Sequence, residues 1–339
     1  MGATSSQPSP EEVADAALYG EVELNELRAA FELLKSIPEG VVSASSFQGF
    51  PKVLPWDRLA TAMTEARSSG PDDVVAHWPG FLALVTRCCK TSKRERLRAL
   101  SLLYADAGEL LSPAALSRLV GDALAAARLG DVVSAEGAEP LASVAADAML
   151  ASASVNVDDW LSWANEQLPT LALVQPTFLL QYLCAVGRAS ARGRKAALEA
   201  AATDGALNAA LLSVQEPLLR GSQGGVEAAG EPLLLPAAAW LVGLALGPAV
   251  EAREWRCLYS SASHGLSMNR FAHHSANYGG PTLLLASTAR GELFGAYIDT
   301  PLKPSDKFVG GRDCFLFRLT PTFHVFRTTT IASNFVLFR

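Results

Sequence analysis

The chain has 339 residues, half of them hydrophobic and 18% charged, so it can bury a sizeable core, and its composition excludes an intrinsically disordered protein. The formal net charge of -6 is uneven, because residues 251–339 carry ten Lys or Arg and six Asp or Glu, whereas residues 1–250 carry 18 and 28. This balance argues against nucleic-acid binding and favours an acidic protein surface as the partner of the C-terminal part.

The first six residues, MGATSS, fit the pattern for N-myristoylation, with Gly2 as the acceptor and Ser6 at the small polar position. We assign residues 1–20 to a flexible N-terminal tail that carries this acceptor, and the alternative is that the tail is unmodified. One myristoyl chain gives only marginal membrane binding, and no basic cluster or cysteine lies nearby. A second attachment therefore has to come from a protein partner or from elsewhere in the fold.

Residues 21–130 have helical periodicity. The stretch ELNELRAAFELLKSI spaces its apolar residues by three or four, at Leu24, Leu27, Phe31 and Leu34. The stretch around Gly108 predicts a helix, a loop and a helix with the outline of an EF-hand. With Gly108 placed as the invariant loop glycine, the ligand positions fall on apolar residues, namely Leu103, Ala105, Ala107 and Ala114. We predict an EF-hand-like domain without calcium ligands.

Residues 131–219 continue as Ala/Leu-rich helices, interrupted at Pro140, Pro169, Pro176 and Gly187. No fixed repeat is convincing, although stacked helix pairs of the solenoid kind are an alternative. Two uncharged runs, 167–187 and 232–250, approach the length of a membrane span, but both contain prolines. In the second run only Ala237 to Leu246 can form one helix, about 15 Å long. We therefore predict that both runs are buried helices.

The glycine-rich stretch 220–232 predicts a linker into a last domain, 233–339. GPTLLLASTARGELFGAYIDT indicates a strand, a turn at Ala289 to Gly291 and a second strand. CFLFRLTPTFHVFRT turns at Thr320 to Thr322, and its apolar residues alternate on one face, at Phe315, Phe317, Leu319, Phe323 and Val325. We predict an α+β chain, in which helices precede half-buried antiparallel strands of a sandwich or barrel.

Four blocks in order resemble the TLDc domain, a β-sandwich module of the oxidation-resistance proteins: WRCLYSSASHGLSMNRF, GPTLLLASTARGELFGAY, KPSDKFVGGRDCFLFRLTP and NFVLFR. The resemblance begins at Trp255 and covers about the last quarter of the chain. A myristoylation pattern, EF-hand-like helices and a TLDc domain, in this order, most resemble the mTOR-associated lysosomal member of the family. TLDc domains normally continue beyond the block matching NFVLFR. We therefore expect an incomplete domain whose segment Asn334 to Arg339 exposes an apolar strand edge.

Several polar clusters invite a catalytic or metal-binding interpretation. Ser260, Ser261 and Ser263 precede His264, but the segment lacks a GxSxG elbow and an evident acid partner. We predict a structural role for them at the helix that leads to Phe271. The residues His264, His273 and His274, with Cys257 or Cys314, lack the spacing of zinc ligands, and we predict neither a metal nor a cofactor.

The five cysteines, Cys88, Cys89, Cys184, Cys257 and Cys314, show neither secretory framework spacing nor a CxxC pair, which indicates a reducing compartment. Cys257 and Cys314 are redox candidates because relatives protect against oxidative stress, although a cysteine within a strand usually acts as a small hydrophobe. The vicinal pair Cys88 and Cys89 lies beside Lys90, Lys93 and Arg94 and is the better candidate for an exposed thiol.

The resemblance implies a non-enzymatic adaptor that binds the peripheral sector of the vacuolar-type proton ATPase and regulates it. Acylated Gly2 would hold the protein on the cytoplasmic side of lysosomal or vacuolar membranes, with a link to mTOR nutrient signalling. The partner-binding candidates are exposed-loop residues, Ser261, His264, Lys303 and Lys307. The alternative function is oxidative-stress protection through a redox-active thiol. A third alternative is that the shortened domain does not fold and the chain is inactive.

Overall fold

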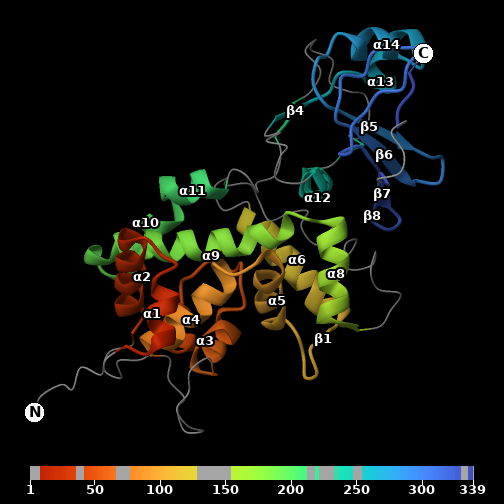
Figure 1. Ribbon diagram of the computed structural model, residues 1–339. Helices are drawn as coiled ribbons and strands as arrows, with labels where there is room; N and C mark the ends of the chain where they lie inside the picture. Colours follow the sequence, from red (N-terminus) through yellow and green to blue (C-terminus); the bar gives the residue numbers. More distant parts are fainter. Residues whose placement is uncertain are drawn as a thin grey trace, which may run out of the picture.

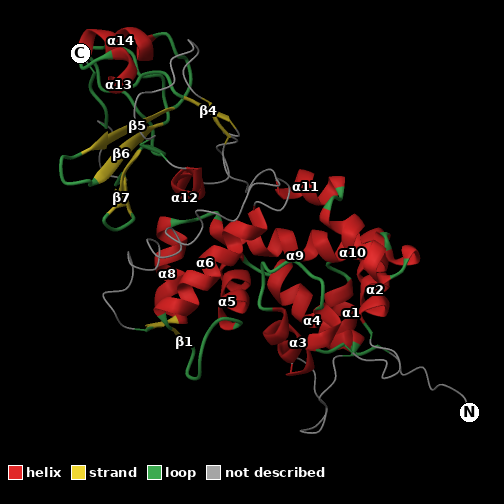
Figure 2. Ribbon diagram, turned by 180° about the vertical axis from the view of Figure 1, so that it is seen from behind, coloured by secondary structure: helices red, strands yellow, loops and turns green. Residues whose placement is uncertain are grey.

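The computed structural model describes residues 8–35, 42–65, 77–127, 154–211, 218–220, 233–234, 236–246, 254–329 and 335–338 (Figures 1 and 2). A helical body is followed by an antiparallel sheet near the C-terminus, so the predicted α+β class is confirmed. Gly2 and residues 221–232 of the predicted linker lie outside the described residues. The predicted domain boundaries stay predictions.

In its described residues, the helical body contains short and medium-length helices with one short strand pair. Its N-terminal elements are α1 (Pro10–Ala16), α2 (Glu21–Leu34), η1 (Ala44–Phe47), α3 (Trp56–Glu65), α4 (Trp78–Cys89), α5 (Lys93–Leu102), β1 (Leu110–Leu111) and α6 (Pro113–Ala127). The remaining elements are β2 (Val155–Asn156), α8 (Val157–Gln167), α9 (Leu171–Arg188), η2 (Ser190–Arg192), α10 (Arg194–Ala202) and α11 (Gly205–Leu211).

Helix α9 is the centre of this body (Figure 1). Helices α2, α4, α5, α6, α10 and α11 all pack against it, and most of its residues are buried. Helices from both sides of residue 130 therefore share one core. The predicted interruption at Pro169 is correct, because Pro169 lies between α8 and α9.

The interruptions predicted at Pro176 and Gly187 are wrong, because both residues lie inside α9. Burial against the surrounding helices outweighs their low helix propensity. Gly187 is required by the packing, since a Cβ atom there would lie 1.9 Å from the backbone oxygen of Glu26 on α2. The glycine thus permits the close approach of α2 and α9.

Both apolar runs are buried helices, as predicted. The first becomes α9, and the second becomes α12 (Pro236–Leu246), close to the expected bounds. No single helix in the described part of the chain is long and apolar enough to cross a membrane. Helices α8 and α9 pass that test only as a pair, and the chain bends by 101° between them.

The predicted helix, loop and helix around Gly108 is formed by α5 and α6. Ser92 and Glu95 cap the start of α5 in a reciprocal capping box. Gly108 adopts a φ of 81°, which favours glycine. The loop strand β1 pairs antiparallel with β2, so the loop is fixed to the segment that begins α8. Leu103 and Ala105 occupy the positions where calcium would need oxygen ligands.

The C-terminal region has one four-stranded antiparallel sheet in the order β5-β6-β7-β8. Its strands are β5 (Thr282–Ser287), β6 (Leu293–Ile298), β7 (Phe315–Thr320) and β8 (His324–Arg327). It is accompanied by β4 (Glu254–Arg256), which pairs with β3 (Leu218–Arg220), and by α13 (Ser261–His264) and α14 (Met268–Ala276). The predicted hairpin and its turn are confirmed, and Gly291 in that turn has a φ of 81°.

One face of the sheet, which we call the inner face, joins the core of the helical body. It carries the residues predicted to alternate, Phe315, Phe317, Leu319, Phe323 and Val325, all of which are buried. Gly295 makes room for this packing, since a Cβ atom there would lie 2.5 Å from the ring of Phe317. Among the described residues no second large sheet packs against this four-stranded sheet. The helical body covers its inner face instead.

Strand β8 is the edge of the sheet, and the helical body covers that edge. The backbone N–H of Val325 donates to Oε1 of the buried Gln167 at 2.6 Å. Arg327 donates to the backbone oxygens of Glu166 at 3.0 Å and Ala245 at 2.8 Å, near the C-terminal ends of α8 and α12. Because late carbonyls of a helix lack partners and carry partial negative charge, one guanidinium stabilises two helix ends. We call this set of contacts the junction.

Residues 335–338 do not form the exposed edge that the sequence predicts. Val336 and Val309 exchange backbone hydrogen bonds of 2.8 and 3.0 Å, and Ser305 N–H donates to the backbone oxygen of Phe338 at 2.7 Å. Phe335, Val336 and Phe338 also pack against a small buried cluster of Ile298, Leu302 and Cys314. The loop before β7 thus provides hydrogen-bond partners for the backbone of residues 335–338.

Candidate functional site

The predicted contact residues Ser261 and His264 form the single turn α13. The N–H of Ser260 donates to Nδ1 of His264 at 3.0 Å, and the hydroxyl of Tyr259 donates to the backbone oxygen of Gly265 at 2.6 Å. The side chain of His264 therefore closes the turn, which agrees with the structural role predicted for this motif. Ser261 is exposed at the start of the turn.

Helix α14 packs its aromatic residues against this turn. Tyr259 lies between His264 and Phe271, with ring centroids 5.7 and 5.4 Å away, and the rings of His264 and His274 lie 4.1 Å apart. Arg270 donates to the backbone oxygen of His264 at 2.6 Å. Desolvation and the neighbouring His264 lower the pKa of His274, because a second positive charge there would be repelled.

The aromatic residues of α13 and α14 also connect to the second predicted loop, residues 303–307. The ring of Phe338 lies 5.7 Å from that of Phe271, and the backbone oxygen of Phe338 accepts from Ser305. Lys303 and Lys307 flank Ser305 and are exposed. Phe338 therefore links α14 to the second predicted loop. We call α13, α14 and residues 303–307 together the loop surface.

The sequence prediction missed the apolar part of the loop surface. Leu266 directly follows the SSASHG motif and Met268 comes two residues later, and their exposed fractions are 92% and 68%. Apolar residues are normally expected inside a domain, so nothing in the local pattern marks these two as exposed. Exposed apolar side chains close to the exposed Arg270 are typical of a protein contact.

The loop surface does not have the geometry of a serine hydrolase. The imidazole of His264 accepts a backbone N–H, and no serine hydroxyl of the motif donates to it within the described residues. Within the same residues no group of three or more His, Cys, Asp or Glu is placed to hold a metal ion. The rings of the adjacent His273 and His274 are inclined by 82° to each other.

Comparison with known proteins identifies the region that carries this surface. Residues 238–339 match the family described as the TLDc domain. These residues are a TLDc domain. The match begins 17 residues before Trp255 and includes most of α12.

Curated relatives match part of the chain. Nuclear receptor coactivator 7 of Mus musculus is 32% identical over 114 residues, which are 32% of this chain and 12% of the relative. Nuclear receptor coactivator 7 of Homo sapiens is 34% identical over 87 residues, 26% of this chain and 9% of the relative. Oxidation resistance protein 1 of Xenopus laevis is 36% identical over 75 residues, 22% of this chain and 9% of the relative. The chain thus spans only about a tenth of the length of these relatives.

The two redox candidates of the TLDc domain differ in exposure. Cys257 is exposed and Cys314 is buried. The thiol of Cys314 donates to Oδ1 of Asp299 at 3.2 Å, and the same oxygen accepts from the N–H of Gly311 at 2.7 Å. Burial raises the pKa of both thiols, so at neutral pH both favour the protonated form, which is the weaker nucleophile.

The prediction that Cys88 or Cys89 has an exposed thiol is wrong. Both residues are buried on α4, because that helix turns them toward the core. Burial raises the pKa of Cys88 to about 12 and that of Cys89 well above its usual range. Their neighbours in sequence therefore give no indication of their surroundings.

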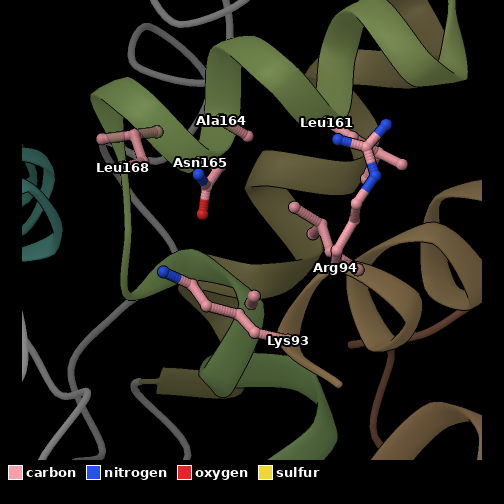
Figure 3. Close-up of a pocket in the computed structure, with 8 residues that line it drawn as sticks. Lys93, Arg94, Leu161, Ala164, Asn165 and Leu168 are labelled. Carbon is pink, nitrogen blue, oxygen red and sulfur yellow. The ribbon is translucent and has the colours of Figure 1, made fainter. Parts of the chain in front are cut away.

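A small cavity lies near the junction, between α5, α8 and α9 (Figure 3). Its volume of about 90 Å³ is far below the roughly 300–1,000 Å³ of small-molecule sites, and its lining is mainly leucine and alanine. Lys93 and Asn165 point toward the same side of it, whereas Arg94 points away, beside Leu161. Desolvation and the cations Arg327 and Arg96 lower the pKa of Lys93. The cavity is too small for a nucleotide-sized cofactor.

Proposed function

We propose that this protein is a non-enzymatic adaptor whose TLDc domain binds the peripheral sector of the vacuolar-type proton ATPase and regulates it. The observation that carries the proposal is the loop surface, where two exposed loops are joined through Phe271 and Phe338. A surface assembled from distant segments and held by packed aromatic rings is preorganised for a partner. Preorganisation lowers the entropic cost of binding.

The chemistry of the loop surface suits an acidic protein. Arg270, Lys303 and Lys307 are exposed cations, and Leu266 and Met268, which shortly precede Arg270, are exposed apolar side chains. Apolar side chains at the centre of a contact contribute most of its affinity, while charges at the rim steer association. The proposed partner is therefore an acidic subunit surface with an apolar pocket.

Membrane attachment is the second part of the proposal. Acylation of Gly2 would hold the protein at lysosomal or vacuolar membranes, and one acyl chain alone binds only marginally. Contact with the membrane-bound ATPase would supply the second attachment by raising the effective concentration of each site for the other. A link to mTOR nutrient signalling would follow from this location.

The competing function is oxidative-stress protection through Cys257 or Cys314, in line with the name of the oxidation-resistance relatives. The raised pKa of both thiols argues against it, since a peroxide-reactive cysteine needs a thiolate. Substituting both cysteines with serine separates the two functions. ATPase binding survives this change if the adaptor function holds, whereas thiol-based protection disappears.

The experiment is a pull-down of the purified peripheral ATPase sector with the full chain, read together with the rate of ATP hydrolysis. We expect co-purification and a changed rate. Lys303→Glu combined with Lys307→Glu should weaken binding about tenfold, since charge reversal at a rim costs on this scale. Lys52→Glu is the matched control, because Lys52 is exposed on the helical body.

Two outcomes would overturn the proposal. One is failure of the folded wild-type protein to co-purify with the ATPase sector. The other is equal binding by the double variant and the control. The membrane part is tested separately by Gly2→Ala, which should move the protein from the lysosomal membrane fraction to the soluble fraction of cells.

A further inference from the structure

Positively charged side chains gather where strand β8 meets the start of α5. Lys93 and Arg96 lie one turn apart on α5, so their side chains leave the helix on the same side. Arg327 is the last residue of β8 and belongs to the TLDc domain. The charges of Arg327 and Arg96 both lower the pKa of Lys93, after the larger effect of desolvation. We call Lys93, Arg96 and Arg327 the cation cluster.

The cation cluster has no counter-ion within the part of the chain that the structure describes. Other cations of α5 are paired there. Arg94 contacts Asp158 at 3.3 Å, and Arg98 contacts Glu109 at 2.6 Å. None of the three cluster residues forms an ion pair with a described residue. Like charges held close together in partly desolvated surroundings repel each other, so the cluster favours the approach of an anion.

One donor of the cation cluster is buried without a partner. The Nε atom of Arg96 is inaccessible to solvent and makes no hydrogen bond to the described residues. Such a donor is destabilising, and native structures usually provide it with a partner, which can be an ordered water or an ion. The geometry of Arg96 therefore points to a ligand with hydrogen-bond acceptors.

Arg327 is held in place and still has an unused nitrogen atom. Its Nε and Nη2 make the junction bonds to the backbone oxygens of Glu166 and Ala245, and its guanidinium lies 5.4 Å from the ring centre of Phe315. Its Nη1 has no partner among the described residues. Desolvation lowers the pKa of Arg327, and the carboxylates of Glu166 and Asp313 oppose this effect. Both carboxylates are exposed, so solvent and salt screen them.

The cavity beside Lys93 has the size of a small oxyanion. Its volume is about 90 Å³, and one water molecule needs roughly 10–15 Å³, so the cavity can hold a few waters or one tetrahedral ion. Lys93 and Asn165 lie on the same side of it (Figure 3), and the amide of Asn165 can donate a hydrogen bond. Lys93 is also the first residue of α5, where the helix dipole adds to the positive potential.

We propose that the cation cluster binds one phosphate group, and that the bound group joins α5 of the helical body to β8 of the TLDc domain. Phosphate carries roughly two negative charges at neutral pH and several acceptor oxygens, which suit guanidinium and ammonium donors. The small cavity excludes larger polyanions. The proposal uses residues outside the loop surface and does not depend on the proposed function.

The test is isothermal titration calorimetry of the full chain with inorganic phosphate at constant ionic strength. We expect saturation at one phosphate per chain. Lys93→Gln should weaken the affinity about tenfold, as expected for the loss of one charge-assisted hydrogen bond. Lys195→Gln is the matched control, because Lys195 is exposed on α10, and it should bind phosphate as the wild type does.

A parallel titration with glycerol 3-phosphate distinguishes the two sources of a phosphate group. Affinity equal to that of inorganic phosphate assigns the site to phosphate esters, and weaker affinity assigns it to the free ion. Both results support the cation cluster as the site.

Thermal unfolding separates loss of binding from loss of folding. Without phosphate, Lys93→Gln should unfold at the wild-type temperature or above it, because the substitution removes a repelling charge. Saturating phosphate should then raise the unfolding temperature of the wild type more than that of the variant.

Three results would overturn the proposal. One is the absence of saturable binding to the wild type, and another is equal affinity of Lys93→Gln and Lys195→Gln for phosphate. The third is a Lys93→Gln variant that unfolds well below the wild type in phosphate-free buffer, since Lys93 would then serve the fold itself.

Discussion

Burial determines how reactive each cysteine thiol is. Cys88, Cys89, Cys184 and Cys314 are buried, and only Cys257, which follows β4, is exposed among the five cysteines. Its thiol donates to the backbone oxygen of Tyr259 at 3.5 Å. Partial burial raises the pKa of Cys257, so even this thiol is mainly protonated at neutral pH. The structure therefore offers one accessible but weakly nucleophilic sulfur.

Alkylation of the native protein tests this conclusion. We expect one fast-reacting thiol, with a rate that reaches half its maximum at a pH above the usual thiol range of about 8.5, because only the thiolate reacts. Cys257→Ser should remove the fast phase, and Cys184→Ser should leave it intact. A second fast thiol in the folded protein would contradict the burial of the other four.

Close helix contact is the main feature at the scale of the elements. Helices α2 and α9 approach so closely at Gly187 that no larger residue fits against the backbone of Glu26. Arg188, the next residue, forms ion pairs with Glu26 at 2.8 Å and Asp204 at 2.7 Å. These pairs are partly exposed and contribute little to stability by themselves, whereas the backbone contact fixes the distance between the helices.

Gly187→Ala should lower the free energy of unfolding by about 1–3 kcal/mol, because the added methyl group forces the two helices apart. Urea denaturation followed by circular dichroism measures the change. Gly205→Ala in α11 is the control, since a Cβ atom there meets nothing within 4 Å. It should be neutral or slightly stabilising. Equal effects of the two substitutions would contradict the proposed packing at Gly187.

The whole molecule is held together by the junction between the helical body and the TLDc domain. Its polar contacts are made by Gln167 and Arg327. A further hydrogen bond joins the two parts outside the junction, from the hydroxyl of Thr170 to the backbone oxygen of Leu244 at 2.9 Å. The inner face of the sheet adds apolar contact to the same core. An edge strand that is covered in this way is protected from pairing with other chains.

Gln167→Leu removes the acceptor for the N–H of Val325. A buried N–H without a partner costs about 1–3 kcal/mol, so the edge strand should open more often. Hydrogen exchange of the Val325 amide measures this opening, and we expect it to become faster. Asn165→Ala on the same helix is the control, because Asn165 is exposed. Unchanged exchange at Val325 would show that the junction does not depend on this bond.

The sequence by itself determined the features that depend on local pattern. Helical spacing predicts α2 and the α5–loop–α6 unit, and strict alternation predicts the buried side of β7 and β8. The four ordered blocks were sufficient to predict the TLDc domain, which the family match confirms. These features can be predicted from sequence because the periodicity of an element and the residues of a motif depend only on neighbouring positions.

The tertiary structure alone decided what covers each apolar face. Pro176 and Gly187 continue a helix because surrounding helices bury it, and Cys88 and Cys89 are buried despite charged neighbours. The loop surface exists because Phe271 meets Phe338, 67 positions later in the chain. Periodicity shows which side of an element is apolar, but the segment that covers that side is chosen by packing between residues far apart in the sequence.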